Sequence, residues 1–469
     1  MIASPISTHQ RDAFQTIVGE GNVLTQNIED YSHDWTEDLR FPPDAVVKPA
    51  TTKEVSQIMQ YCHAHRIPVT PRGAGTGLSG GALPVQGGIV LAIERMNKIE
   101  MIDQENLQVT TQPGVITQLL QEEVAQIGLF YPPDPSSRGS CFIGGNIAEN
   151  AGGPKAVKYG VTKDYVLNLE VVLPDGSVIW TGANVLKNAT GYNLTQLMVG
   201  SEGTLGIVTK IVLKLIPMPR HQLLMKASFA HPEDACRAVS AIFRAGLTPS
   251  ALEFMERSGI AYAAEYIGKV PDLDPQTQAQ LLIEVEGNHL EALYQECETI
   301  DEVLQKHHVL ENLFAERHEE KEALWKLRRV MGEAVHAIST YKEEDTVVPR
   351  ARLPQLLEAV KAIGQRYHFE SVCYGHAGDG NLHVNILKGD MSAEQWEVTV
   401  KKGIRELFEK VVALEGTISG EHGIGWVQRE YMDIAFSPTH LALMHALKQV
   451  FDPHHLLNPD KVLPAPIAS

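Results

Sequence analysis

The chain has 469 residues, more than one ordinary domain holds, so we expect at least two domains. Its 58 Asp and Glu residues outnumber 40 Lys and Arg residues, and the net charge of −18 argues against binding to nucleic acid or anionic membranes. No stretch approaches the roughly 20 apolar residues of a membrane-spanning helix, and the first residues lack the pattern of a secretory signal. We therefore expect a cytoplasmic protein without a transmembrane segment.

The first half of the chain is predicted to be a lead-in helix followed by strands and turns. Residues 1–40 have a helical pattern. Thr51 or Thr52 is predicted to cap a helix between two strands, the second of which ends at Arg72. From 73 to 216 glycine and proline are frequent and apolar runs are short. Helices are expected near 115–127 and 192–199.

A glycine-rich loop follows the second predicted strand. The stretch PRGAGTGLSGG contains the spacing GxGxxG at Gly75, Gly77 and Gly80. A dinucleotide-binding fold requires a helix directly after such a loop, and the glycines and Pro84 that follow exclude one. The loop can still bind phosphate, because small residues expose backbone N–H groups to an anion.

Two further stretches have the same character. They are PPDPSSRGSCFIGGNIAENAGG at 132–153 and GSEGTLGIVT at 200–209. Each stretch alone is more simply explained as a tight structural turn. Three such stretches in one strand-rich half favour a long diphosphate cofactor that lies across several loops.

The second half of the chain is predicted to be α+β, beginning after the PMPR segment at 217–220. Strands are expected at 221–230 and 279–286. Amphipathic helices are expected at 232–245, 289–307, 310–338 and 392–415. The five cysteines are scattered, odd in number and without a CxxC pair, which argues against a disulfide framework or a four-cysteine zinc site. We predict that they are reduced packing residues.

Two histidines flank a glycine-rich turn in YGHAGDGNLHVN. His376 and His383 would share a face of a helix, but the glycines between them exclude a helix and favour a turn between two strands. The later stretch SGEHGIG adds Glu421 and His422. Two imidazoles and a carboxylate can form an open site for a divalent ion, zinc or manganese. The chain has 19 histidines, and most of these must be surface or packing residues.

These motifs, together with the closing FDPHHLLNPDKVLP, occur in the order found in one family. The chain resembles the FAD-dependent D-2-hydroxy-acid dehydrogenases of the vanillyl-alcohol oxidase fold. That family includes D-lactate dehydrogenases, D-2-hydroxyglutarate dehydrogenases and the flavoprotein subunit of glycolate oxidase, to which the chain is most similar. The resemblance runs from about residue 25 to the C-terminus.

The resemblance implies an α+β fold with three segments. Residues 1–217 would form an FAD-binding domain of two α+β subdomains. Residues 218–427 would form an α+β cap domain with an antiparallel sheet, and 428–469 would return to the FAD domain.

The resemblance also implies which residues contact FAD. The glycine loop contains no histidine, so FAD is expected to be bound without a covalent bond. Lys461 is expected beside Asn458 near the flavin, and Glu202, Gly206 and Ile207 near the adenosine end. The full set of expected FAD-binding residues is Pro71, Arg72, Gly73, Ala74, Gly75, Thr76, Gly77, Ser79, Pro133, Asp134, Ser136, Ser137, Gly144, Gly145, Asn146, Gly153, Glu202, Gly206, Ile207 and Asn458.

The catalytic roles follow from the same resemblance. His376, His383 and Glu421 would bind the divalent ion, and His422 would act as the base. The C2 hydrogen of a short D-2-hydroxy acid would leave as hydride to flavin N5. Arg328 would bind the substrate carboxylate, since a guanidinium forms two parallel bonds to it, while Arg329 is expected on a solvated helix face. Lys342 and Asn385 would complete the site.

Three other functions remain open from the sequence. A metal hydrolase could be built on the two histidines and Glu421, but it would leave the glycine-rich stretches without a function. An FAD enzyme without net oxidation, similar to the ether-lipid synthase of the same fold, is a second alternative. A third is a flavin-bearing subunit of a multi-subunit glycolate dehydrogenase. The sequence leaves glycolate, D-lactate and D-2-hydroxyglutarate as substrates, an acceptor protein or quinone for the electrons, and a homodimer as an oligomeric state.

Overall fold

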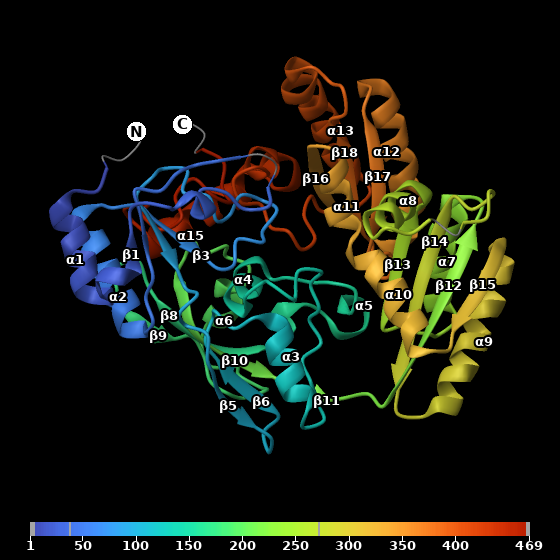
Figure 1. Cartoon of the computed structure of the whole chain (residues 1–469), viewed down its shortest axis with the longest axis horizontal. Helices are drawn as coiled ribbons and strands as arrows, with labels where there is room; N and C mark the ends of the chain where they lie inside the picture. Colours follow the sequence, from blue (N-terminus) through green and yellow to red (C-terminus); the bar gives the residue numbers. More distant parts are fainter. Residues whose placement is uncertain (1–4, 37–38, 271–272, 466–469) are drawn as a thin grey trace. The chain divides into compact units, whose positions relative to one another are not determined.

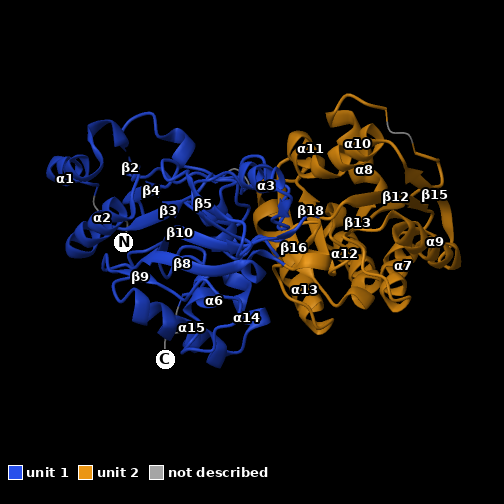
Figure 2. Ribbon diagram, turned by 90° about the horizontal axis from the view of Figure 1, so that it is seen from below, with its two compact units in different colours: residues 1–152, 161–218, 421–469 blue, residues 153–160, 219–420 orange. Residues whose placement is uncertain are grey.

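The structure is a computed structural model that describes residues 5–36, 39–270 and 273–465. The chain divides into two compact units (Figure 2). Unit 1 comprises Met1–Gly152, Val161–Met218 and Glu421–Ser469, and unit 2 comprises Gly153–Gly160 and Pro219–Gly420. The predicted boundaries lie at 217/218 and 427/428. In the structure the chain passes between the units at 218/219 and 420/421, and the short segment Gly153–Gly160 also belongs to unit 2.

Unit 1 begins with a small sheet that shares one core with two helices (Figure 1). The sheet has the order β1-β2-β4-β3, in which β2, β4 and β3 are parallel and β1 is antiparallel to β2. As predicted, Thr51 caps the second helix, its side chain accepting from the Glu54 amide. The elements are α1 (Thr8–Val18), β1 (Val23–Leu24), β2 (Ala45–Val47), α2 (Thr52–His65), β3 (Val69–Arg72) and β4 (Ile89–Ala92).

A second, antiparallel sheet completes unit 1. Its strand order is β5-β6-β10-β8-β9. The strands are β5 (Ile99–Asp103), β6 (Gln108–Thr111), β8 (Val166–Val172), β9 (Val178–Trp180) and β10 (Ile207–Lys214), with β7 (Leu129–Phe130) paired to β11 (Ile216–Pro217). The helices are α3 (Thr117–Ala125), α4 (Ile143–Glu149), α6 (Leu194–Met198), α14 (Met432–Ala435) and α15 (Pro438–Phe451).

Unit 2 is built on one seven-stranded antiparallel sheet. Its order is β15-β12-β14-β13-β17-β18-β16, so strands distant in sequence become neighbours. The strands are β12 (His221–Phe229), β13 (Ala251–Glu256), β14 (Ala279–Gly287), β15 (Val309–Ala315), β16 (Tyr341–Val347), β17 (Glu370–Gly375) and β18 (Asn381–Leu387). Strands β17 and β18 form the predicted hairpin around the two histidines.

Helices cover both faces of this sheet (Figure 2). One layer consists of α7 (Pro232–Arg244), α9 (Leu290–Lys306), α12 (Leu353–Tyr367) and α13 (Val400–Ala413). The other consists of α8 (Arg257–Tyr266), α10 (His318–Arg329) and α11 (Met331–Ile338), whose apolar side chains share a core with Tyr374 of β17. The short helix α5 (Ala156–Tyr159) belongs to unit 2.

Several elements differ from the sequence prediction. Of the described residues within 1–40, only Thr8–Val18 form an α-helix, and α8 and α12 lie in stretches for which no helix was predicted. The stretch predicted as a helix over 310–338 begins as strand β15, because it pairs with the distant strand β12, and only then continues as α10 and α11. Helix α4 was not predicted, because glycine is unfavourable within a helix. A Cβ atom at Gly144 would lie 2.6 Å from Cβ of Pro113, so close packing requires glycine at this position. The same glycine lowers the helix propensity of the stretch, and the sequence therefore does not predict the helix.

Candidate functional site

The three glycine-rich stretches meet within unit 1. A Cβ atom at Gly73, directly after β3, would lie 3.7 Å from Cα of Gly145 near the start of α4. The third stretch contacts the end of α4, where the Glu202 amide donates to the Ala148 carbonyl over 2.8 Å. A Cβ atom at Gly203 would lie 2.8 Å from Cγ of Pro71, which begins the first stretch. As predicted, no helix follows the first glycine loop.

The first loop has the properties of an anion cradle. Gly75 has a φ of +74°, and a Cβ atom there would lie 2.1 Å from Nη2 of Arg72. Arg72 Nη1 donates to the His33 carbonyl over 2.7 Å, which holds the guanidinium under the loop. Oγ of Ser79 is buried and has no hydrogen-bond partner among residues 5–36, 39–270 and 273–465. Backbone N–H groups and an unpartnered hydroxyl in one place fit the diphosphate of FAD.

The C-terminal segment returns to this cradle. Nδ2 of Asn458 donates to the carbonyls of Gly81, over 3.0 Å, and Glu202, over 2.8 Å. Nζ of Lys461 donates to the Leu83 carbonyl over 2.6 Å, and burial lowers the pKa of Lys461 to about 7. Asn458 therefore connects the first and third glycine-rich stretches, and Lys461 binds at the end of the first stretch.

The carboxylate of Glu202 forms hydrogen bonds to the segment that contains His422, the predicted base. Its oxygens accept from the amides of Ile424, over 2.8 Å, and Gly425, over 2.6 Å. Burial raises the pKa of Glu202 to about 7, although these two amide donors lower it. A second carboxyl, that of Glu149, lies nearby, since a Cβ atom at Gly423 would fall 2.1 Å from its Oε2 and 3.0 Å from Cδ of Glu202. Burial, followed by the charge of Glu202, raises the pKa of Glu149 well above its usual value.

Glu421 and His422 lie in unit 1 beside the second glycine-rich stretch. A Cβ atom at Gly152 would lie 2.6 Å from Oε2 of Glu421. Nε2 of His422 lies 4.0 Å from Oε1 of Glu421. Gly423 follows with a φ of +79°, so the turn after the two predicted site residues requires glycine.

The two hairpin histidines lie together in unit 2. His383 on β18 is opposite Tyr374 of β17 and Asp345 of β16, and His376 directly follows β17. Their ring centroids are 5.3 Å apart with an interplanar angle of 86°, and both side chains are buried. Nδ1 of His383 lies 3.5 Å from Asp345 Oδ1 and 3.6 Å from Glu343 Oε1. This set of imidazole and carboxylate donors fits zinc or manganese.

Arg328 lies on the same face of the sheet. Its side chain is 4% exposed, and its guanidinium carbon lies 5.1 Å from the centroid of the Tyr374 ring. Nη2 is 2.7 Å from Oε2 of Glu253, while the buried Nε has no hydrogen-bond partner in the described part of the chain. Arg329 is half-exposed beside Trp325. The buried guanidinium with an open donor is suited to an anionic ligand.

Asn385 shares this face, but Lys342 does not. Asn385 is fully buried on β18 and pairs with Glu343. Lys342 pairs with Ile386, and its Nζ lies 4.9 Å from the centroid of the Trp396 ring, on the face covered by α13. Side chains alternate along a strand, so adjacent positions face opposite ways. The structure therefore does not bring Lys342 to the histidines.

The remaining predicted FAD residues are distributed around unit 1. The group Pro133, Asp134, Ser136 and Ser137 lies between β7 and α4, where Asp134 Oδ1 accepts from Arg138 Nη1 over 2.8 Å. Asn146 donates to Oγ1 of Thr117 over 2.6 Å. Ile207 is part of a hydrophobic core, and a Cβ atom at Gly206 would lie 2.4 Å from Cγ1 of Val171. Gly153 belongs to unit 2.

Several buried carboxylates of the site were missed by sequence reasoning, among them Asp345 beside His383. Glu253 and Glu149 lie in ALEFME and in NIAEN, neither of which has a motif that marks an acid as functional. An acidic residue within an otherwise apolar strand was the available signal for Glu253.

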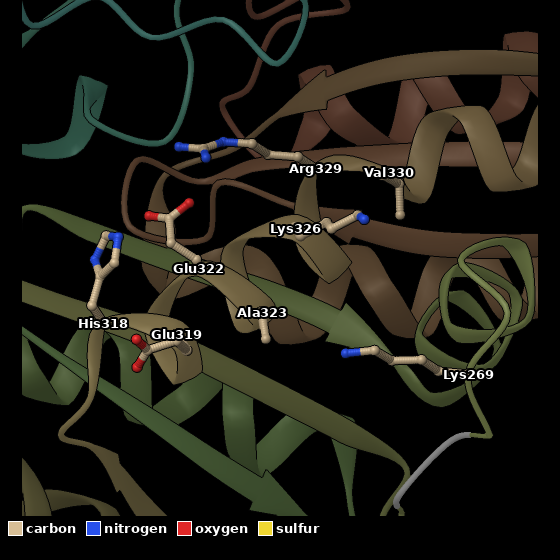
Figure 3. A pocket seen from close by; sticks show the side chains of 8 residues that line it. All are labelled: Lys269, His318, Glu319, Glu322, Ala323, Lys326, Arg329 and Val330. Carbon is tan, nitrogen blue, oxygen red and sulfur yellow. The ribbon is translucent and has the colours of Figure 1, made fainter.

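A separate hollow of about 560 Å³ lies along α10 in unit 2 (Figure 3). Its lining combines basic, acidic and apolar side chains and contains none of the predicted site residues. The lining residues are Lys269, His318, Glu319, Glu322, Ala323, Lys326, Arg329 and Val330.

The fold and the cradle define an FAD-dependent oxidoreductase of the vanillyl-alcohol oxidase type. The family model "FAD binding domain" matches residues 43–182, and "FAD linked oxidases, C-terminal domain" matches residues 218–462. The chain belongs to this family of FAD-linked oxidases.

Two relatives are similar over nearly the whole chain. The glycolate oxidase subunit GlcD of Bacillus subtilis (strain 168) is 41% identical over 436 residues, which cover 92% of this chain and 91% of the relative. The D-lactate dehydrogenase of Anaerostipes hadrus is 37% identical over 440 residues, covering 92% of each chain. The crystal structure of p-cresol methylhydroxylase with substrate bound has a TM-score of 0.81 at 17% identity and 98% coverage of both chains, which supports the fold alone.

Across the described ranges, no helix combines the length and apolar character needed to cross a lipid bilayer.

Proposed function

We propose that the protein oxidises a short D-2-hydroxy acid, glycolate or D-lactate, to the corresponding 2-oxo acid. The observation that carries this proposal is the position of Arg328, His376 and His383 on one buried face of the unit 2 sheet. An anion-binding guanidinium beside two metal-binding imidazoles matches a substrate with a carboxylate next to a hydroxyl. The printed names of the two relatives, a glycolate oxidase subunit and a D-lactate dehydrogenase, support the same substrate class.

His376 and His383 would hold a divalent ion together with Glu421. The amide of Gly420 donates to the Asp345 carbonyl over 3.0 Å and to its Oδ2 over 2.8 Å, so Gly420 is fastened to β16. Asp345 is the strand partner of His383. Glu421 follows Gly420 by one peptide bond, and consecutive Cα atoms are about 3.8 Å apart. Glu421, the proposed third ligand, and His422 therefore directly follow a residue that is held to β16.

Each residue has a defined part in the reaction. Arg328 binds the substrate carboxylate through its planar fork, and Asn385 orients the bound acid. A ring nitrogen of His422 accepts the hydroxyl proton, which a neutral imidazole can do near pH 7. A divalent ion held by His376, His383 and Glu421 would supply the positive charge that lowers the pKa of the substrate hydroxyl. Bound FAD would supply the hydride acceptor, so the substrate would lose one proton to His422 and one hydride and become a 2-oxo acid.

FAD would be held without a covalent bond. The glycine loop carries no histidine, and the cradle offers backbone N–H groups and the Ser79 hydroxyl instead. The electrons would pass to an acceptor protein or a quinone. The alternatives are oxidation of D-2-hydroxyglutarate, or a role as the flavin-bearing subunit of a larger glycolate dehydrogenase.

Anaerobic stopped-flow absorbance with a panel of D- and L-2-hydroxy acids tests the proposed activity. Glycolate or D-lactate should bleach the flavin, whereas the L-acids should not. A faster reaction with D-2-hydroxyglutarate would favour the alternative substrate, and no bleaching with any acid would contradict the proposal.

The ion is tested separately by metal analysis of protein purified without chelator. We expect one divalent ion per chain and loss of flavin bleaching after chelation, with recovery on adding zinc or manganese. Full activity in a preparation that contains no divalent ion would remove the three-ligand site.

A further inference from the structure

The side chain of Glu253 is fully enclosed in unit 2, with 0% exposure. It lies on β13, two positions before Met255, which pairs with Tyr374 of β17. Residues two apart on a strand share a face, so Glu253 faces the same side of the sheet as Tyr374 and its partner His383. An enclosed carboxylate costs free energy unless it is paired. The residues that pair with Glu253 therefore indicate why β13 contains a buried carboxylate.

Glu253 contacts both parts of the proposed substrate site. Its two carboxylate oxygens each lie 2.9 Å from Nδ1 of His376. Oε2 also lies 2.7 Å from Nη2 of Arg328. One carboxylate therefore joins the proposed metal ligand to the proposed anchor of the substrate.

We propose that Glu253 is a positioning residue, which holds His376 in its metal-binding tautomer and fixes the direction of the Arg328 guanidinium. The proposal rests on the function proposed above. An ionised carboxylate can only accept a hydrogen bond, so Nδ1 of His376 carries the proton and Nε2 keeps the lone pair for an ion. A carboxylate behind a ligating histidine commonly orients the ring and strengthens it as a ligand.

The same carboxylate prepares Arg328 for its substrate. A buried guanidinium is unfavourable without a negative partner, and Glu253 supplies that charge before any acid binds. The ion pair uses Nη2, while the buried Nε has no partner among the residues that the structure describes. Glu253 therefore holds one side of the guanidinium and leaves other donors for the substrate carboxylate.

The chain offers a matched control on the same strand. Glu256 is also buried, and its Oε1 lies 2.9 Å from Nζ of Lys361, while its Oε2 accepts from the Cys373 amide over 2.8 Å. Three positions from Glu253, it faces the other side of the sheet. Replacing it removes a comparable buried charge without touching His376 or Arg328.

The test compares the zinc affinity of the FAD-loaded protein in wild type, Glu253→Gln and Glu256→Gln by competition with a chromogenic chelator. A glutamine amide can donate to Nδ1 of His376 and allow the tautomer with Nε2 protonated. We expect Glu253→Gln to weaken zinc binding by about 10–100-fold. The KM for the hydroxy acid should rise as well. Both variants should lower the melting temperature, but Glu256→Gln should bind zinc as tightly as wild type.

Three outcomes would overturn the inference. If Glu253→Gln keeps the zinc affinity and KM of wild type and loses only thermal stability, Glu253 is purely structural and the proposed function stands. If the wild type binds neither zinc nor manganese, the ion site of the proposed function fails and the role of Glu253 fails with it. If Glu253→Gln does not fold, Glu253→Asp replaces it, because its shorter carboxylate keeps the charge but cannot span both partners. A folded Glu253→Asp with wild-type zinc affinity and KM would also overturn the inference.

Discussion

The two units build their parts of the proposed site from different groups. In unit 1 the cradle consists of main-chain atoms from three glycine-rich stretches, with Gly75 and Gly203 at positive φ. In unit 2 the proposed site consists of side chains that β13, β16, β18, the end of β17 and helix α10 bring to one buried sheet face. A backbone cradle is encoded locally, because glycine decides the conformation of its own residue. A side-chain face depends on strand register, which short motifs do not record.

The largest expected effect is on the rate of flavin reduction in His422→Ala, a variant that should lose proton removal but keep cofactor binding. His422→Ala should retain FAD, since the cradle uses other residues, but should slow flavin reduction by substrate about 100-fold or more, because no base remains for the hydroxyl proton. Anaerobic stopped-flow absorbance measures the rate, and the flavin-to-protein absorbance ratio measures FAD content. His440→Ala, on the surface of α15, serves as the control. Unchanged reduction in His422→Ala would rule out the base assignment.

The next variant tests the side-chain face of unit 2. Arg328→Lys keeps the positive charge beside Glu253 but loses the planar fork, so the KM for the hydroxy acid should rise about tenfold or more. FAD content should not change. Steady-state kinetics measure KM. Arg329→Lys is the matched control, because Arg329 is the next residue of the same helix and is half-exposed. Equal KM values in both variants would show that Arg328 does not anchor the substrate.

The sequence predicted the locally encoded features better than the face of unit 2. The cap at Thr51 and the hairpin around His376 and His383 follow from short patterns, and the structure contains both. Lys342 was predicted beside the substrate, yet it lies on the other face, because a shift of one position along a strand reverses the side chain. Glu253 was missed because its importance depends on two partners that are distant in the sequence.

Gly145→Ala distinguishes a glycine needed by the cofactor from one needed by the fold. A Cβ atom at Gly145 would meet no atom within 4 Å, and alanine favours a helix by up to about 1 kcal/mol over glycine. The flavin-free variant should therefore be as stable as wild type or slightly more stable. If FAD approaches this position, the same methyl group should weaken FAD binding about tenfold, as one lost contact of about 1.4 kcal/mol would. Flavin fluorescence titration measures binding, and equal affinity would remove Gly145 from the cradle.

The smallest expected effect concerns the buried carboxyl pair in unit 1. Burial and the charge of Glu202 raise the pKa of Glu149 well above its usual 4.5, so the native state keeps a proton that the unfolded chain releases. Stability from this group is therefore present below pH 4.5 and is lost as pH rises toward the folded pKa. Glu149→Gln cannot ionise, so its advantage over wild type should be near zero at pH 4 and should grow to about 2 °C or more in melting temperature at pH 8. Differential scanning fluorimetry of flavin-stripped protein measures this difference, with the exposed Glu123→Gln as control. A difference that is the same at both pH values would show that Glu149 ionises normally in the folded protein.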